Sequence, residues 1–275
     1  MDVSDILRHK KLYIFDLDGT IYLGGKPFDF AVRYIERLRG AGRRILFFTN
    51  NASHSSSFYY TKLSALGFDP QRREIMTAGD VTAEFILRHR RGKTVYLLGT
   101  NELRRDWRTR GIRIVSDDDI TLGTQPDIVV SSFDTELTYE KLTHAVLAVR
   151  EGAEYICTHP DRVCPTEDGF IPDSGAIAAA ITTATGIVPQ FFGKPGSETM
   201  DMILEVTRSE RDDIVVFGDR LYTDIALGKK NGVTSCLVLT GETAMSELDS
   251  VPEDSLPDIV LPSLREADLA TFGDD

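Results

Sequence analysis

The sequence predicts an α/β protein with a three-layer core on a parallel sheet, interrupted by a second α/β domain. Short apolar runs rich in β-forming residues each lead into a polar loop, which is the pattern of strands buried on both faces. Segments with helical spacing separate these runs, as in a parallel α/β sheet. The middle of the chain carries its own set of such elements, so we expect an inserted domain.

The first half of the core is predicted from residues 12 to 48. Residues 12–15 form a continuous apolar run that is followed at once by a polar loop containing glycine. Residues 30–38 have helical spacing, and residues 45–48 form a second apolar run that ends at Thr49. The order strand, helix, strand therefore predicts two parallel strands.

The second half of the core repeats this pattern near the end of the chain, where apolar runs at 214–217 and 236–239 each lead into a glycine-containing loop. Between them lie segments with helical spacing or an extended pattern, at 81–90, 95–98, 128–130, 139–149 and 155–157. We expect residues 1–78 and 187–275 to form the core and residues 79–186 to form the inserted domain. The sequence contains no internal repeat.

Composition narrows the classes of partner. The chain of 275 residues has 31 Lys and Arg against 43 Asp and Glu, a formal charge of −12, which argues against nucleic acid and against an anionic membrane. Part of this charge lies in an acidic tail, residues 249–275. No segment approaches the roughly 20 apolar residues that span a bilayer.

The three cysteines, Cys157, Cys164 and Cys236, are an odd number in a long chain. This is not the pattern of a secreted domain held by disulfides, and it predicts reduced thiols and a cytoplasmic protein. For Cys164 we expect a buried, unreactive thiol rather than a nucleophile, because the sequence offers no partner that would lower its pKa.

Polar residues follow the predicted strands where their carboxyl ends should meet, which is where open α/β sheets bind ligands. These residues are Asp16 and Asp18, Thr49 and Asn50, Lys194 after the apolar pair 191–192, and Asp219. Clustered carboxylates raise one another's pKa unless a cation neutralises them, and oxygen ligands of this kind suit Mg2+. We therefore expect a magnesium site whose ligands are Asp16, Asp18, Asp219 and Asp224.

The other residues of the predicted site suit phosphate. Lys194, Thr49 and Asn50 would bind the anion through a charge, a hydroxyl and an amide. Asp16 would attack phosphorus and form an aspartyl-phosphate, as carboxylates do in covalent catalysis. Asp18 would protonate the leaving alkoxide and then accept a proton from water.

Each of these residues alone has a structural alternative. An acidic pair or the Thr49–Asn50 pair could cap a helix, Lys194 could be a surface lysine, and Asp219 could cap the helix expected near residue 223. Their order and their common position after strands favour function over chance.

These motifs, taken together, resemble the haloacid dehalogenase superfamily of phosphohydrolases, whose four motifs occur here in order. The matching segments are residues 16–20, Thr49, Lys194 within 193–195, and residues 218–220 with Asp224. The continuation at residues 20–22 and the long insertion are similar to the NagD-like or p-nitrophenylphosphatase branch. That resemblance implies a Rossmannoid core, a type IIA cap over 79–186, and hydrolysis of nucleotide, sugar, phosphoglycolate or pyridoxal phosphates. A phosphotransferase or phosphomutase, or a non-catalytic sensor of phosphorylated ligands, stays open as an alternative.

The expected cap contains a segment, residues 158–161, that is similar to a loop which selects the substrate in related proteins. His159 replaces the commoner Asn there, so His159 and Asp161 are candidate specificity residues. A packed loop residue is an equal alternative for His159, and contact with substrate is open for Asp134. The sequence leaves the oligomeric state open, including a homo-oligomer formed through the cap.

Overall fold

The computed structural model describes residues 2–166 and 169–273 and divides the chain into two compact units. The core unit comprises residues 1–49, 59–76 and 194–275, and the inserted unit comprises residues 50–58 and 77–193. The ranges expected from the sequence also include residues 1, 167–168 and 274–275, which lie outside the described residues.

The core unit is built on a six-stranded sheet with the order β15-β14-β13-β1-β4-β5. Its strands are β1 (Leu12–Phe15), β4 (Arg44–Thr49), β5 (Ile75–Thr77), β13 (Ile214–Gly218), β14 (Thr234–Val238) and β15 (Ile259–Leu261). The pairs from β15 to β4 are all parallel. The predicted runs at 12–15, 45–48, 214–217 and 236–239 are confirmed as strands, and so is the α/β fold class.

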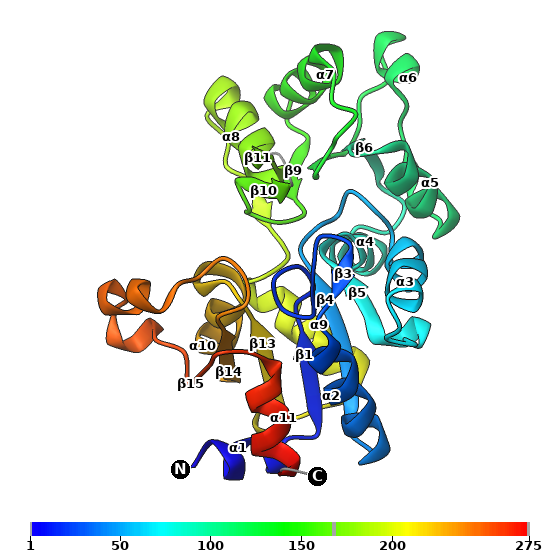
Figure 1. Cartoon of the computed structure of the whole chain (residues 1–275). Coiled ribbons are helices and arrows are strands. Elements are labelled where there is room, and N and C mark those ends of the chain that lie inside the picture. Colours follow the sequence, from blue (N-terminus) through cyan, green and yellow to red (C-terminus); the bar gives the residue numbers. More distant parts are fainter. Residues whose placement is uncertain (1, 167–168, 274–275) are drawn as a thin grey trace. The chain divides into compact units, whose positions relative to one another are not determined.

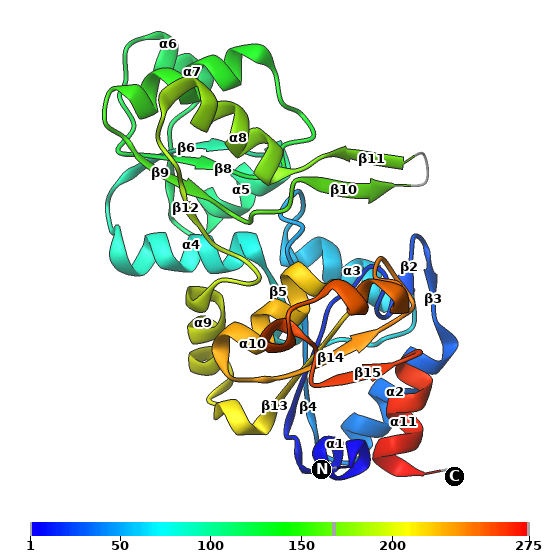
Figure 2. The same cartoon turned by 90° about the vertical axis from the view of Figure 1, so that its left-hand side faces the viewer.

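Helices cover both faces of this sheet, with α9 and α10 on one side and α2 and α11 on the other (Figure 2). The helices of the unit are α1 (Val3–His9), α2 (Asp29–Gly40), α3 (Ser56–Ala65, which begins in the inserted unit), α9 (Ser197–Thr207), α10 (Ala226–Asn231) and α11 (Leu264–Phe272). A short hairpin joins β2 (Tyr22–Leu23) to β3 (Lys26–Pro27). Among the described residues, none of the helices is both long and apolar enough to cross a membrane.

Aromatic packing holds the central strands to α2. Phe15 stacks on Phe217 with ring centroids 5.1 Å apart, and Tyr34 of α2 meets both rings edge-on. All three side chains are fully buried, and offset and edge-on ring pairs are the favoured arrangements. The loops that leave β1 and β13 thus start from rigid positions.

The described part of the acidic segment, residues 249–273, is not a separate tail. Ile259–Leu261 forms the edge strand β15, and Leu264 and Ala267 of α11 are fully buried in the core. The apolar positions of this segment decide its structure, and its buried acidic residue, Asp268, forms an ion pair with Arg37 at 2.9 Å.

The inserted unit, which carries the helices labelled α5, α7 and α8 in Figure 1, has its own parallel five-stranded sheet. The strand order of this sheet is β12-β9-β8-β6-β7. Its strands are β6 (Thr94–Leu98), β7 (Arg113–Ile114), β8 (Ile128–Ser131), β9 (Glu154–Cys157) and β12 (Gln190–Phe191), with a hairpin of β10 (Val163–Thr166) and β11 (Gly169–Pro172). Its helices are α4 (Ala78–His89), α5 (Asn101–Thr109), α6 (Asp117–Thr121), α7 (Tyr139–Arg150) and α8 (Ser174–Thr185).

The apolar pair before Lys194 belongs to this second sheet. Gln190 and Phe191 pair with Ile156 and Cys157 of β9, and the amide of Phe192 donates to the carbonyl of Cys157 at 2.9 Å. The expectation that Lys194 follows a strand of the same sheet as Asp16 is therefore wrong. A two-residue strand carries too little pattern to show which sheet it joins.

The prediction that Cys164 is buried is wrong. Cys157 and Cys236 are buried, but Cys164 on β10 is only half-buried. All three are free thiols, as the odd number predicts.

Candidate active site

The predicted site forms at the carboxyl ends of three neighbouring strands of the core unit. Asp16 follows β1, Thr49 is the last residue of β4, and Asp219 follows β13. Because β4, β1 and β13 are adjacent and parallel, these residues lie at one edge of the sheet.

Three carboxylates come together there with one ammonium group. Oxygen atoms of Asp16, Asp219 and Asp224 lie within 4.8 Å of one another. The buried Lys194 forms ion pairs with Asp16 and, at 2.6 Å, with Asp224, and it donates to the carbonyl of Phe48 at 3.3 Å. Three negative charges and one positive charge leave a formal charge of −2 in the cluster.

Burial sets the protonation of this cluster. It raises the pKa of Asp16 to about 8, opposed by Lys194 and reinforced by Asp224 and Asp219. It also raises the pKa of Asp219 to about 6, with a further contribution from Asp224. Burial lowers the pKa of Lys194, but the carboxylates of Asp16 and Asp224 together raise it by more than burial lowers it. The ammonium group therefore stays charged. The carboxylates thus carry their full charge only when another cation balances them.

The donor set fits a divalent cation. In the part of the chain that the structure describes, Oδ1 of Asp219 is buried without a hydrogen-bond partner, while its Oδ2 accepts the amide of Glu242 at 2.7 Å. A bare buried carboxylate oxygen is costly unless a cation binds it. Carboxylate oxygens, a formal charge of −2 and this unpaired acceptor together suit Mg2+.

Three glycines make room for the carboxylates. A Cβ on Gly241 would lie 2.0 Å from Oδ2 of Asp219, and one on Gly19 would lie 2.4 Å from the same oxygen. A Cβ on Gly218 would lie 2.1 Å from Cβ of Asp224. In the sequence these glycines stand out only as loop residues, although the position of Gly19 and Gly218 next to the acidic motifs is a usable signal.

Asp18 lies outside the group of three carboxylates. Its side chain is exposed, and Oδ2 accepts a hydrogen bond from the hydroxyl of Tyr22 at 3.1 Å. Desolvation by the surrounding protein raises the pKa of Asp18, while Lys62 and Tyr22 act in the opposite direction. This environment favours a carboxyl group that exchanges its proton.

A second cation near the carboxylates was missed in the sequence analysis. Arg220 forms an ion pair with Glu242 at 2.9 Å, and its amide donates to Asp224 at 3.3 Å. Although burial lowers the pKa of Arg220, Asp16, Tyr222, Asp219 and Glu242 raise it. Its place beside Asp219 in the sequence was the available signal.

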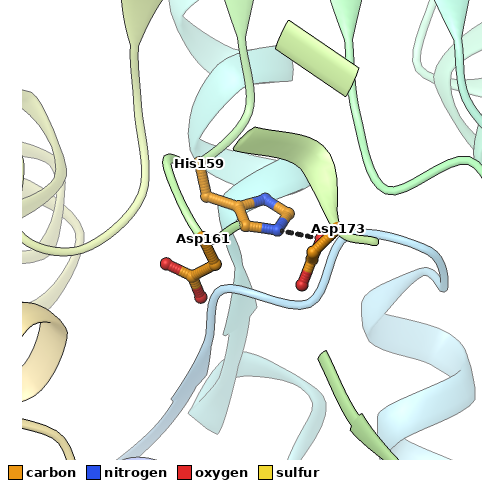
Figure 3. Close-up of side chains that lie close together, drawn as sticks. All are labelled: His159, Asp161 and Asp173. Carbon is orange, nitrogen blue, oxygen red and sulfur yellow. Dashed lines mark hydrogen bonds and ion pairs between the residues drawn. The ribbon is translucent and has the colours of Figure 1, made fainter. Parts of the chain in front are cut away.

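The other predicted residues meet within the inserted unit. Asn50 donates to Oδ1 of Asp161 at 3.1 Å, and His159 is fully buried. Figure 3 shows the ring of His159 directed at Asp173, with its Nε2 2.9 Å from Oδ1 of Asp173, while the carboxylate of Asp161 turns to another side. Nδ1 of His159 lies 2.9 Å from the hydroxyl of Thr158. These are the contacts of a packed loop residue.

Asp173 is the partner that the sequence did not reveal. It is the N-cap of α8, and its Oδ1 accepts the amide of Ser174 at 2.5 Å. An aspartate before a helix predicts a cap, but nothing in the sequence pairs it with a histidine 14 residues earlier. Asp134 is likewise bound locally, by Lys141 at 3.1 Å and the amide of Glu136 at 2.9 Å.

Replacing Gly241 tests the room left for Asp219. We expect Gly241→Ala to push the carboxylate aside and to weaken Mg2+ binding by about 10-fold or more, the usual cost of disturbing the support of a ligand. Isothermal titration calorimetry measures the affinity. Gly40→Ala is the matched control, because a Cβ there meets nothing within 4 Å. Equal affinities of both variants would contradict this role.

The raised pKa values predict how pH affects the metal-free protein. The carboxyl of Asp16 titrates near 3.8 when unfolded and near 8 when folded, so the folded state holds the extra proton between these values. The contribution of Asp16 to the free energy of unfolding is therefore fully present at low pH and is lost as the pH rises towards 8. We expect the thermal midpoint in EDTA to fall by several degrees between pH about 5 and about 8, less so in Asp16→Asn. A midpoint that rises over this range would refute the assignment.

Known proteins that resemble this chain show the family to which it belongs. Profiles of two families match, one described as haloacid dehalogenase-like hydrolase over residues 13–113 and one as HAD-hydrolase-like over residues 191–267. An acid sugar phosphatase of Staphylococcus haemolyticus is 36% identical over 256 residues, which cover 92% of this chain and 95% of that protein.

Solved structures are similar over nearly the whole chain. A 4-nitrophenylphosphatase of Thermotoga maritima has a TM-score of 0.89 and 38% identity, covering 96% of this chain and 98% of its own. A glycerol phosphate phosphatase of Mycobacterium tuberculosis, solved in complex with magnesium, has a TM-score of 0.86 and 31% identity, covering 94% and 77%. The chain therefore belongs to the haloacid dehalogenase-like hydrolases, in their NagD-like branch of phosphatases.

Proposed function

We propose that this protein is a magnesium-dependent phosphatase that hydrolyses small phosphate monoesters through an aspartyl-phosphate on Asp16. The observation that carries the proposal is the position of Asp16, whose carboxylate is paired with the buried Lys194 beside Asp219 and Asp224. One carboxylate in a cluster that suits both a cation and a phosphate is an arrangement for phosphoryl transfer.

In the first step, an oxygen of Asp16 attacks phosphorus while the bond from phosphorus to the ester oxygen breaks. Lys194 stabilises the negative charge on the phosphoryl oxygens, and the hydroxyl of Thr49 is a further donor. Asp18 gives its proton to the leaving alkoxide. Mg2+, when bound by Asp16, Asp219 and Asp224, supplies charge neutralisation to the phosphoryl group.

In the second step, water attacks phosphorus and the bond to Asp16 breaks. Asp18, now ionised, accepts the proton of the water, and inorganic phosphate leaves. The raised pKa of Asp18 supports the protonated form that the first step requires. Its exposed position supports exchange with substrate and water.

The names of the relatives support phosphate monoesters as the substrate class. They include an acid sugar phosphatase, a 4-nitrophenylphosphatase and a glycerol phosphate phosphatase. We infer that the inserted unit selects among such substrates, with His159 and Asp161 as its candidate residues. The three free cysteines support a cytoplasmic site of action.

Replacing the nucleophile tests the mechanism. We expect Asp16→Asn to lower kcat at least 1,000-fold, because an amide does not form the covalent intermediate, while the fold measured by circular dichroism is kept. Release of inorganic phosphate from 4-nitrophenyl phosphate and from glycerol phosphate measures the activity.

Asp201→Asn is the control, since this aspartate is exposed and lies outside the cluster. EDTA should remove the activity of the unchanged protein, and added Mg2+ should restore it. Activity retained in Asp16→Asn would rule out covalent catalysis by Asp16. Activity that is unchanged by EDTA would rule out a requirement for Mg2+. Transfer of the phosphoryl group to a sugar without phosphate release would instead support a mutase.

Replacing Asp161 tests substrate selection by the inserted unit. Asp161 is buried and held by Asn50, so we expect Asp161→Ala to change the ratio of kcat/KM between sugar phosphates and 4-nitrophenyl phosphate by about 10-fold. A panel of phosphate monoesters measures it. Asp118→Ala, an exposed aspartate of the same unit, is the control. An unchanged ratio in Asp161→Ala would exclude this residue from selection.

A further inference from the structure

We propose that Tyr22 is a positioning residue for the acid-base group Asp18, and that Lys62 holds the ring of Tyr22 in place. The proposal rests on the function inferred above and adds to it the means by which an exposed carboxyl group is oriented. It concerns residues of the core unit alone.

A tight turn brings Tyr22 back to Asp18. The amide of Ile21 donates to the carbonyl of Leu17 at 3.0 Å, and the amide of Gly19 donates to the carbonyl of Tyr22 at 2.8 Å. Gly19 has φ of +82°, a conformation that glycine adopts without strain. The hydroxyl of Tyr22 then lies 3.1 Å from Oδ2 of Asp18.

Tyr22 is a fixed donor in this pair. Its side chain is fully buried, and its hydroxyl donates to Oδ2 of Asp18. Asp18, by contrast, is exposed, and an exposed aspartate rotates among several rotamers. The hydrogen bond to Oδ2 selects one of them and leaves Oδ1 for proton exchange with the leaving group.

Lys62 completes the arrangement from α3. Its ammonium lies 4.1 Å from the centre of the Tyr22 ring, which is the geometry of a cation–π contact. Tyr22 is thus held between the turn of its own backbone and a cation on helix α3.

The leaving group distinguishes this role from a structural one. Nitrophenolate is a stable anion and departs without a proton, whereas the alkoxide of glycerol phosphate needs one from Asp18. Loss of orientation at Asp18 should therefore slow cleavage of the alkyl ester selectively. The ratio of the kcat/KM for glycerol phosphate to that for 4-nitrophenyl phosphate measures this selectivity. Each kcat/KM covers the steps up to the cleavage of the ester bond.

The experiment compares glycerol phosphate with 4-nitrophenyl phosphate at saturating Mg2+. We expect Tyr22→Phe to lower kcat/KM about 10-fold for glycerol phosphate and less than about 2-fold for 4-nitrophenyl phosphate, as part of the roughly 100-fold or more that acid catalysis contributes. In an Asp18→Asn background, Tyr22→Phe should have no further selective effect, because the two residues act as one unit.

Two further variants keep the test decisive. Tyr13→Phe also removes a buried hydroxyl from the core unit, one that donates to the carbonyl of Leu7 at 2.6 Å, and should leave the ratio unchanged. Lys62→Met removes no buried hydroxyl and should lower the ratio about 3-fold, so it answers the question even if Tyr22→Phe misfolds. If Tyr22→Phe lowers kcat/KM equally for both esters, or for neither, the positioning role of Tyr22 is overturned while the proposed function stands. An unchanged protein that cleaves neither ester would instead refute the proposed function, and the inference with it.

Discussion

The ion pairs of Lys194 with Asp16 and Asp224 are the interaction on which the site depends. The pair with Asp16 joins residues 178 positions apart in the sequence. Together the two pairs place one positive charge among three carboxylates, of which Asp219 and Asp224 are buried and Asp16 is half-buried. Without Lys194, the burial of these carboxylates would drive them towards their neutral forms. The three carboxylates and Lys194 together carry a formal charge of −2, which is why the cluster suits a divalent cation.

The backbone around the cluster is built to the size of a carboxylate. Gly19 and Gly241 leave no space for even one methyl group beside Asp219, and the amide of Glu242 holds the oxygen between them. The ligands therefore have little freedom to relax when the cation is absent. This rigidity rests on the aromatic packing of Phe15 and Phe217, from whose strands the acidic loops leave. Because the carboxylates are already oriented before the cation binds, binding costs less conformational entropy.

The sequence predicted the parts of the fold that a continuous apolar run determines by itself. The run at 12–15 leads straight to Asp16 and is confirmed as β1. The prediction was wrong at β12, because a strand of two residues shows no alternation of buried and exposed positions. Lys194 was therefore expected after a strand of the wrong sheet. The bond between Tyr22 and Asp18 and the pairing of His159 with Asp173 were also out of reach, since both depend on how a turn or a loop closes in space.

The boundaries of the two units fall directly beside the candidate site. One lies between Thr49 and Asn50, and another lies between Gly193 and Lys194. Exchange of the inserted unit between relatives, by recombination or in a designed chimera, would thus cut the chain within one peptide bond of a residue that we propose to bind phosphate. A transplant that is to keep the chemistry of its host must leave Thr49 and Lys194 on the host's side of the junction.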